Sequence, residues 1–159
     1  MAQQLPSERN RLPRGLSFEF FPPKTDEGIQ RLVAGPAAKL AAFKPDFFSV
    51  TYGAGGTTRQ GTAALVGQLL DAGRPCVPHL SFGGSTTHEL NALIDQYREL
   101  GVTQLLCLRG DEASAGTHPP IYAKELVQHV KARYGDHFEL TVAAYPEVHP
   151  KTPRQSHGS

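Results

Sequence analysis

Glu19 is the side chain of this sequence that is best suited to acid–base chemistry. It lies in the segment SFEFFPP at residues 17–23, between three phenylalanines. A carboxyl group that aromatic neighbours shield from water favours its protonated form, which is the form a general acid needs. The alternative is that Glu19 lies on an edge strand and points into solvent. The residues alone leave both interpretations open.

A glycine-rich segment follows the next apolar run. Thr51 and Tyr52 open the sequence TYGAGGTT at residues 51–58, and Ala54 lies among its glycines. Glycines let backbone amides approach a ligand, and a threonine at the end of the segment can cap a following helix. The spacing matches neither the dinucleotide fingerprint nor the phosphate loop with its lysine. A cofactor contact and a plain tight turn both fit.

A histidine and a pair of opposite charges follow the third and fourth apolar runs. His79 lies in the segment PHLS, where it can hydrogen-bond a cofactor or serve as a satisfied structural histidine. Arg109, Gly110 and Asp111 follow the fourth run. A glycine between two charges at a strand end favours a ligand that approaches the backbone. The alternative is that Arg109 and Asp111 pair with each other.

The fifth run ends in AAYPEVHP at residues 143–150. Ala143 leaves room beside a ligand, whereas Tyr145 and His149 supply an aromatic face and polar ends. The remaining histidines have no metal-ligand spacing, so we expect no metal. Cys76 and Cys107 lie singly in apolar runs, which predicts buried, reduced thiols rather than a disulfide.

The elements that must position these residues recur about every thirty residues, the length of one β/α unit. We expect a helix near Thr25 that breaks or kinks at Gly35 and Pro36, and a helix that Thr86 caps. Strands of continuous apolar residues separated by helices predict an α/β fold with a parallel sheet. The predicted strands are 16–20, 46–51, 75–80, 104–108 and 138–144. The helices after the first are 57–72, 86–100 and 121–134, and they end at Gly73, Gly101 and Gly135.

Five such units fit two architectures. One is a complete open sheet that binds a phosphorylated small molecule, and the other is the first part of an eight-stranded barrel. The length of 159 residues favours the open sheet, because a full barrel takes about 250 residues. The polar residues at the strand ends favour the barrel.

The composition is that of an ordinary globular domain, with 39% apolar and 19% charged residues. Sixteen basic and fifteen acidic side chains give a net charge of +1, which is no electrostatic signature for nucleic acid or an anionic membrane. No apolar run predicts a signal peptide or a membrane span. We therefore expect a cytoplasmic protein with a small-molecule partner, no nucleic acid and no membrane.

Taken together, the strand-end motifs resemble the FAD-dependent methylenetetrahydrofolate reductases of the bacterial type. The resemblance covers residues 16–150, and five motifs in this order are specific where each alone is weak. It implies a (β/α)8 TIM barrel, here an incomplete one of about five parallel β/α units. The matching segments are SFEFFPP (17–23), SVTYGA (49–54) with GGTTR after it, PHL (78–80), LRGD (108–111) and VAAYPEVHP (142–150).

The resemblance implies a flavoenzyme of one-carbon metabolism. FAD takes hydride from NADH or NADPH and passes it to 5,10-methylenetetrahydrofolate, which becomes 5-methyltetrahydrofolate. Glu19 takes the position of the general acid that helps to open the folate ring, and Asp111 that of the aspartate beside the flavin. The other positions that line the flavin or the shared substrate site are Thr51, Tyr52, Ala54, His79, Arg109, Gly110, Tyr122, Ala143, Tyr145 and His149.

The chain departs from the family at its end, because the family's barrel continues for about 100 to 150 residues more. We expect a flexible N-terminus at 1–15, a partial catalytic barrel at 16–150 and a disordered tail at 151–159. Unpaired edges on the first and fifth strands favour association, including a homo-oligomer. The alternative to an active reductase is therefore a fragment that binds flavin weakly or associates with other subunits.

Overall fold

Five parallel strands form the centre of the fold. The computed structural model describes residues 15–52, 59–82, 86–109 and 122–143. The strands of this part pair in the order β1-β2-β3-β4-β5, each parallel to its neighbours. All five predicted strands are confirmed, with ends that differ by at most two residues. Their bounds are Ser17–Phe20 (β1), Phe47–Val50 (β2), Cys76–Ser81 (β3), Gln104–Leu108 (β4) and Glu139–Val142 (β5).

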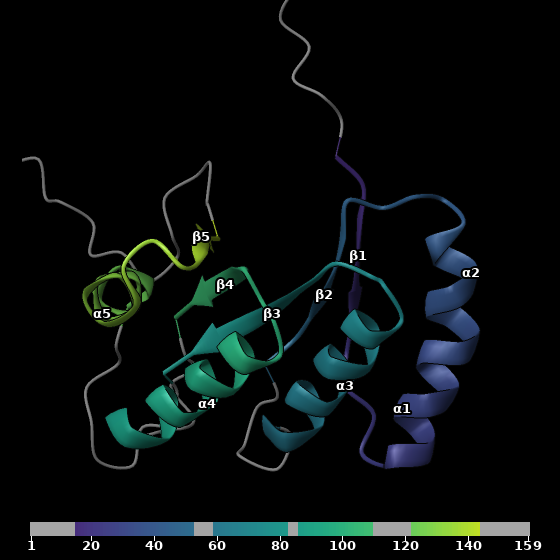
Figure 1. The fold of residues 1–159 in the computed structure, drawn as a ribbon, viewed down its shortest axis with the longest axis horizontal. Coiled ribbons are helices and arrows are strands. Elements are labelled where there is room, and N and C mark those ends of the chain that lie inside the picture. Colours follow the sequence, from purple (N-terminus) through teal and green to yellow (C-terminus); the bar gives the residue numbers. More distant parts are fainter. Residues whose placement is uncertain (1–14, 53–58, 83–85, 110–121, 144–159) are drawn as a thin grey trace, which may run out of the picture.

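The helices between the strands lie on one side of the sheet. In Figure 1, α5, α4, α3 and the α1–α2 segment follow one another in an arc around the outside of the strands. No helix in the described part is both long and apolar enough to span a membrane. The helices are α1 (Asp26–Leu32), the π-helical turn η1 (Val33–Ala37), α2 (Ala38–Ala41), α3 (Arg59–Asp71), α4 (Thr87–Glu99) and α5 (Ala123–Tyr134).

The strand order decides between the two predicted architectures. An open doubly wound sheet reverses its strand order, which places helices on both faces. Here every strand pairs with the next one in the chain, and the helices cover one face only. This is the arrangement of a (β/α) barrel, so the expectation from the strand-end motifs is confirmed and the one from chain length is wrong. Of the expected flexible N-terminus at 1–15 and disordered tail at 151–159, all but residue 15 lies outside the described residues.

The helix ends follow the predicted signals. Thr86 caps α4 through a capping box: its hydroxyl accepts a hydrogen bond from the Glu89 amide at 3.2 Å, and the Glu89 carboxylate accepts one from the Thr86 amide at 2.7 Å. Gly73, Gly101 and Gly135 follow α3, α4 and α5 with φ of 70°, 82° and 58°. Glycine takes this left-handed conformation without the clash of a Cβ, which is why these helices end there.

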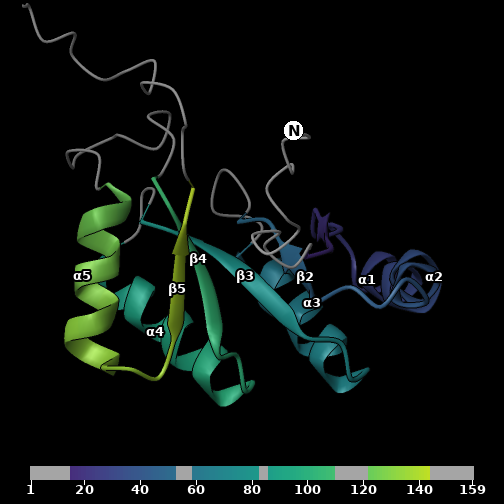
Figure 2. The same cartoon turned by 90° about the horizontal axis from the view of Figure 1, so that it is seen from above.

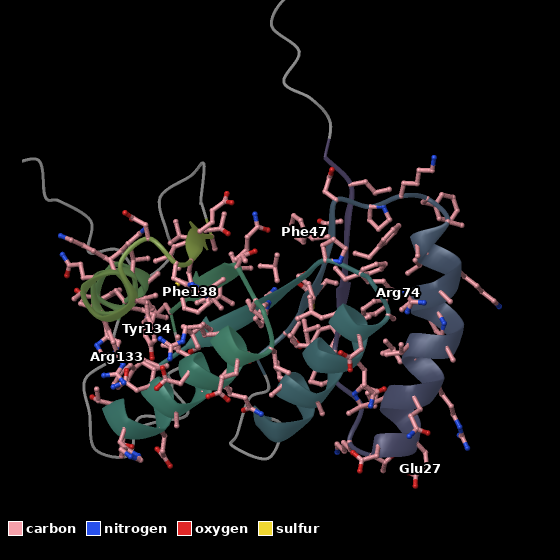
Figure 3. All side chains as sticks on the ribbon, in the orientation of Figure 1. Glu27, Phe47, Arg74, Arg133, Tyr134 and Phe138 are labelled. Carbon is pink, nitrogen blue, oxygen red and sulfur yellow. The ribbon has the colours of Figure 1, made fainter. Side chains whose placement is uncertain are left out.

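The predicted break at Pro36 takes the form of a π-helical turn. The chain stays helical from α1 through η1 into α2, with Pro36 inside the turn. Proline has no N–H for the helical ladder and its ring crowds the preceding turn, so the wider π turn accommodates it. The guanidinium of Arg74 donates a hydrogen bond of 2.7 Å to the Val33 carbonyl of this turn. In Figure 3, Arg74 lies beside this helical segment.

The hydrophobic core lies between the sheet and its helices. Phe48 is the centre of an aromatic stack, with ring centroids 6.1 Å from Phe18 and 5.5 Å from Phe20. Both cysteines are free and buried, as predicted, and burial raises the pKa of Cys76 to about 12 and that of Cys107 to about 11. Other buried members of the core are Val50, Leu65, Leu69, Leu80, Leu90, Ile94, Tyr97, Leu105, Leu126, Val130 and Phe138.

Candidate functional site

Polar side chains gather on the other side of the sheet, here named the inner face. Side chains alternate along a strand, so the neighbours of the core residues point away from the helices. The inner face comprises Ser17, Glu19, Phe47, Ser49, Val77, His79, Ser81, Gln104, Leu106, Leu108, Glu139 and Thr141. Ser49, His79 and Ser81 are buried polar residues of this set. Figure 2 shows β2, β3, β4 and β5 as neighbours in the sheet, seen from above.

The carboxyl ends of the strands bring most of the described site residues to one edge. Thr51 and Tyr52 follow β2, Arg109 follows β4, and Ala143 follows β5. Tyr122 lies at the same edge, because it is the N-cap of α5 and this helix returns from the end of β4. In barrels, ligands bind at this edge, since loops from all strands converge there.

Glu19 and His79 meet across an intervening strand. Nε2 of His79 lies 3.4 Å from Oε2 of Glu19, although β2 separates β1 from β3. The register aligns Glu19 with Ser49 and Ser49 with Val77, so His79 is two residues further along β3. Strands in a barrel are tilted and staggered, which brings such offset positions to one level. The contact therefore follows from barrel geometry.

The flanking phenylalanines do not shield Glu19 from water. Phe18 and Phe20 stack on Phe48 on the helix side, whereas Glu19 points to the inner face. The side chain of Glu19 is 50% exposed, while that of His79 is 7% exposed. Consecutive strand residues point to opposite faces of a sheet, so the sequence neighbours of Glu19 do not determine how exposed its carboxyl group is. The group that Glu19 faces is His79.

Burial favours the neutral form of the His79 imidazole. Burial lowers the pKa of His79, and the nearby charge of Glu19 raises it by a smaller amount. Its Nε2 atom is buried and has no hydrogen-bond partner within the described residues. A buried ring nitrogen without a partner is costly unless a ligand completes it. This nitrogen therefore has an unused capacity for a hydrogen bond.

Arg109 and Tyr122 contact each other at the carboxyl edge. The guanidinium carbon of Arg109 lies 5.3 Å from the centroid of the Tyr122 ring, which is a cation–π contact. Arg109 is half-buried and Tyr122 is 55% exposed. The exposed ring and the cation together offer one surface to an aromatic or anionic part of a ligand.

The two residues that follow β2 have different surroundings. The carbonyl of Thr51 accepts a hydrogen bond of 3.2 Å from the Thr62 hydroxyl, which ties the end of β2 to α3. Tyr52 packs against the hydrophobic core, so its body lies on the helix side and not with His79. Of these two residues, only Thr51 is therefore at a position that faces the inner side of the sheet.

Some predicted site residues lie outside the described part, and two polar residues of the inner face were not predicted from the sequence. No group of three or more histidine, cysteine or acidic side chains that could hold a metal occurs in the described part. Ser49 and Ser81 are buried on the inner face but were not predicted; the signal was a serine within an apolar strand. The predicted residues outside the described ranges are Ala54, Gly110, Asp111, Tyr145 and His149.

The fold and the site define a protein of the (β/α)-barrel class, with polar groups on the inner face and at the carboxyl ends of its strands. A model of the family described as methylenetetrahydrofolate reductase matches residues 6–158. This chain belongs to the methylenetetrahydrofolate reductase family. The family resemblance predicted from the five motifs is thus confirmed.

Individual relatives agree with the family match. The chain is 38% identical over 137 residues to the 5,10-methylenetetrahydrofolate reductase of Escherichia coli, and 37% identical to that of Pectobacterium carotovorum. Each match covers 86% of this chain and 45% of the relative. A methylenetetrahydrofolate reductase (NADH) from Zea mays is 34% identical, with 84% of this chain and 24% of the relative covered. The chain spans about half the length of the bacterial relatives.

Proposed function

We propose that this chain takes part in the reduction of 5,10-methylenetetrahydrofolate to 5-methyltetrahydrofolate, with hydride from NADH or NADPH passed through FAD. The observation that carries the proposal is the contact of Glu19 with His79 on the inner face, 3.4 Å between Oε2 and Nε2. It joins an accessible carboxyl group to a buried ring nitrogen without a hydrogen-bond partner in the described part. The family membership supports the choice of substrate, and the resemblance of the strand-end motifs supports FAD as the cofactor.

Glu19 is the proposed general acid. Its carboxyl group is half exposed, so a ligand on the inner face can reach it. Protonation of the folate nitrogen weakens its bond to the methylene carbon, and ring opening leaves an iminium that accepts hydride. Proton transfer requires a heavy-atom distance of about 2.6–3.2 Å or one bridging water. The long glutamate side chain can adjust to this distance.

The flavin supplies hydride transfer when it is bound, and this chain supplies position and electrostatic field. We assign cofactor binding to His79 on the inner face, to Thr51, Tyr52, Arg109, Tyr122 and Ala143 at the carboxyl edge, and to Ala54, Gly110, Asp111, Tyr145 and His149. Asp111 is the proposed acidic group beside the flavin. The buried imidazole of His79 is the polar side chain of the described part that best fits a hydrogen-bonding ligand.

A second candidate function is that of a subunit or fragment that associates through its strand edges. Among the described residues, β1 and β5 each pair on one side only. Leu16 beside β1 and Val142 in β5 are exposed apolar side chains, at 41% and 49%. Exposed strand edges with apolar side chains favour pairing with another chain.

The first experiment is a visible spectrum of the purified chain with and without added FAD, followed by size exclusion. A flavin band that migrates with a compact species supports the proposed function. A colourless chain that elutes as an assembly supports association alone. This outcome removes the flavin-dependent proposal for this chain.

The second experiment measures NAD(P)H-dependent reduction of methylenetetrahydrofolate by the flavin-loaded chain. We expect Glu19→Gln to lower the rate by about 10²–10⁴-fold, because the general acid is lost. Glu99→Gln is the matched control, since Glu99 is an exposed residue at the far end of α4. Equal rates in the wild type and Glu19→Gln would contradict the assignment of Glu19.

A further inference from the structure

The buried imidazole of His79 and the half-exposed carboxyl group of Glu19 form an asymmetric pair. We propose that His79 is the positioning residue of Glu19, and that it holds the carboxyl group over β2 toward the inner face. The inference rests on the proposed function only for the role of Glu19 as general acid. The pairing itself is a property of the chain without any ligand.

The geometry gives His79 the fixed position and Glu19 the movable one. His79 lies in β3, which pairs with both β2 and β4, and its side chain is 7% exposed. Glu19 lies in β1, which pairs only with β2 among the described strands, and its side chain is 50% exposed. A free glutamate samples several rotamers. A contact of 3.4 Å with a fixed ring favours those that point across the sheet.

Ser49 makes the contact possible. It is the strand partner of Glu19 on β2, and it occupies the inner face between β1 and β3. Its side chain is small and the residue is buried. A bulky side chain at this position would stand between the carboxyl group and the imidazole. The small side chain of Ser49 is therefore required for His79 to position Glu19.

Among the described strand residues of the inner face, no other ionisable group lies beside His79. The inner-face residues nearest to His79 on the neighbouring strands are Ser49 on β2, Leu106 on β4 and Thr141 on β5. None of them titrates. Glu139 is the remaining acidic strand residue of this face in the described part, and it accepts a hydrogen bond of 2.7 Å from Gln104. The helices that pack on β3 lie on the opposite side of the sheet. Glu19 is thus the acidic partner of His79.

The pairing is tested by NMR titration of the histidine rings in the chain without ligand, with His79→Gln used to assign the His79 signal. Loss of the carboxylate charge in Glu19→Gln should lower the pKa of His79, because that charge opposes the effect of burial. Glu99→Gln should leave it unchanged. A His79 pKa that is the same in the wild type and Glu19→Gln overturns the proposal.

Positioning is tested by the side-chain couplings of Glu19, which report its rotamer populations. We expect one dominant rotamer in the wild type, averaging in His79→Leu, and recovery in His79→Gln, whose amide nitrogen takes a position similar to Nε2. Ser49→Val should also cause averaging while His79 is intact. Averaged couplings in the wild type, or no change in either variant, overturn the proposal. Glu19→Gln changes a half-exposed residue and should therefore fold. The His79 ring can be titrated in this variant even if His79→Leu does not fold.

The kinetic consequence separates this inference from the proposed function. In the flavin-loaded chain, His79→Leu should lower kcat about 10²-fold with a smaller change in KM, since a misplaced catalytic group has an effect of this order. His79→Gln should recover most of the loss. A chain that holds no flavin refutes the proposed function but leaves both NMR tests valid. Full turnover in His79→Leu, with Glu19 still required, refutes the positioning role alone.

Discussion

The two faces of the sheet are built from alternate residues of the same strands, yet they differ in chemistry. The helix side is apolar, and Phe48, Leu80 and Leu105 are each at most 1% exposed there. The inner face carries Glu19, His79, Thr141 and three serines. One face therefore supplies most of the free energy of folding, and the other carries the polar groups that we propose bind a ligand. Substitutions on the two faces should have separable effects.

Adjacent residues of β2 give the sharpest test of this difference, and the largest expected effect. Phe48→Ala should lower the free energy of unfolding by about 3–5 kcal/mol, because it removes a buried ring from an aromatic stack. Ser49→Ala, one residue further and on the inner face, should change it by less than about 1 kcal/mol. Urea denaturation measures both. Losses of similar size would show that the inner face is also a structural core.

A single hydrogen bond on the helix side gives the next effect. Arg74→Ala should lower the free energy of unfolding by about 1–3 kcal/mol, because it leaves the Val33 carbonyl of the π-helical turn without its charged donor. Arg31→Ala is the matched control, since Arg31 is exposed on α1. Thermal denaturation of the two variants measures the difference. If both lose the same stability, the Arg74 contact does not stabilise the turn.

Two tyrosines on the helix side should respond in opposite directions. Tyr97 is fully buried and its hydroxyl has no hydrogen-bond partner in the described part, so Tyr97→Phe should raise the free energy of unfolding by about 1 kcal/mol. The Tyr134 hydroxyl donates to the Asn91 carbonyl at 3.2 Å and accepts from Arg133 at 3.1 Å. Figure 3 shows Arg133, Tyr134 and Phe138 together at the end of α5. Tyr134→Phe should therefore lower stability by about 0.5–1.5 kcal/mol.

Urea denaturation of both phenylalanine variants checks the sign. A destabilised Tyr97→Phe would mean that its hydroxyl is satisfied after all. The core of the helix side would then contain a polar contact.

The smallest effect is a pH dependence that belongs to the inner face. Burial lowers the pKa of His79 in the folded chain below its unfolded value of about 6.5, so the unfolded chain binds more protons between the two values. Stability should therefore rise with pH through this window, level off above about 6.5, and fall on acidification. His79→Gln should show a flatter dependence in thermal melts. An equally steep fall in the variant would assign the effect to other groups.

Much of the fold could be predicted from the sequence because the signals were local. Apolar runs identified the five strands, and Thr86, Gly73, Gly101 and Gly135 identified helix ends. Periodicity alone could not predict the strand order, since it identifies a strand but not its neighbour; only the resemblance to a barrel family implied it. The π-helical turn at Pro36 was expected only as an interruption, because its form depends on packing against the Arg74 loop.

The site was predicted by motif rather than by environment. Glu19 and His79 are 60 positions apart in the chain, and their contact depends on the tilt of strands that the sequence does not specify. The phenylalanines beside Glu19 suggested a shielded acid, but strand alternation places them on the other face. Strand alternation, applied to each predicted strand, would have placed Glu19, Ser49 and His79 on the same face before any contact was known.

The most direct test of a functional inner face is an NMR titration of the isotope-labelled chain with FAD. Signals of His79 and of the carboxyl edge, including Thr51 and Arg109, should shift, whereas those of the core on the helix side, including Leu65 and Ile94, should stay in place. Shifts confined to the helix side, or no shifts at millimolar FAD, would contradict the assignment of the inner face as the ligand-binding side.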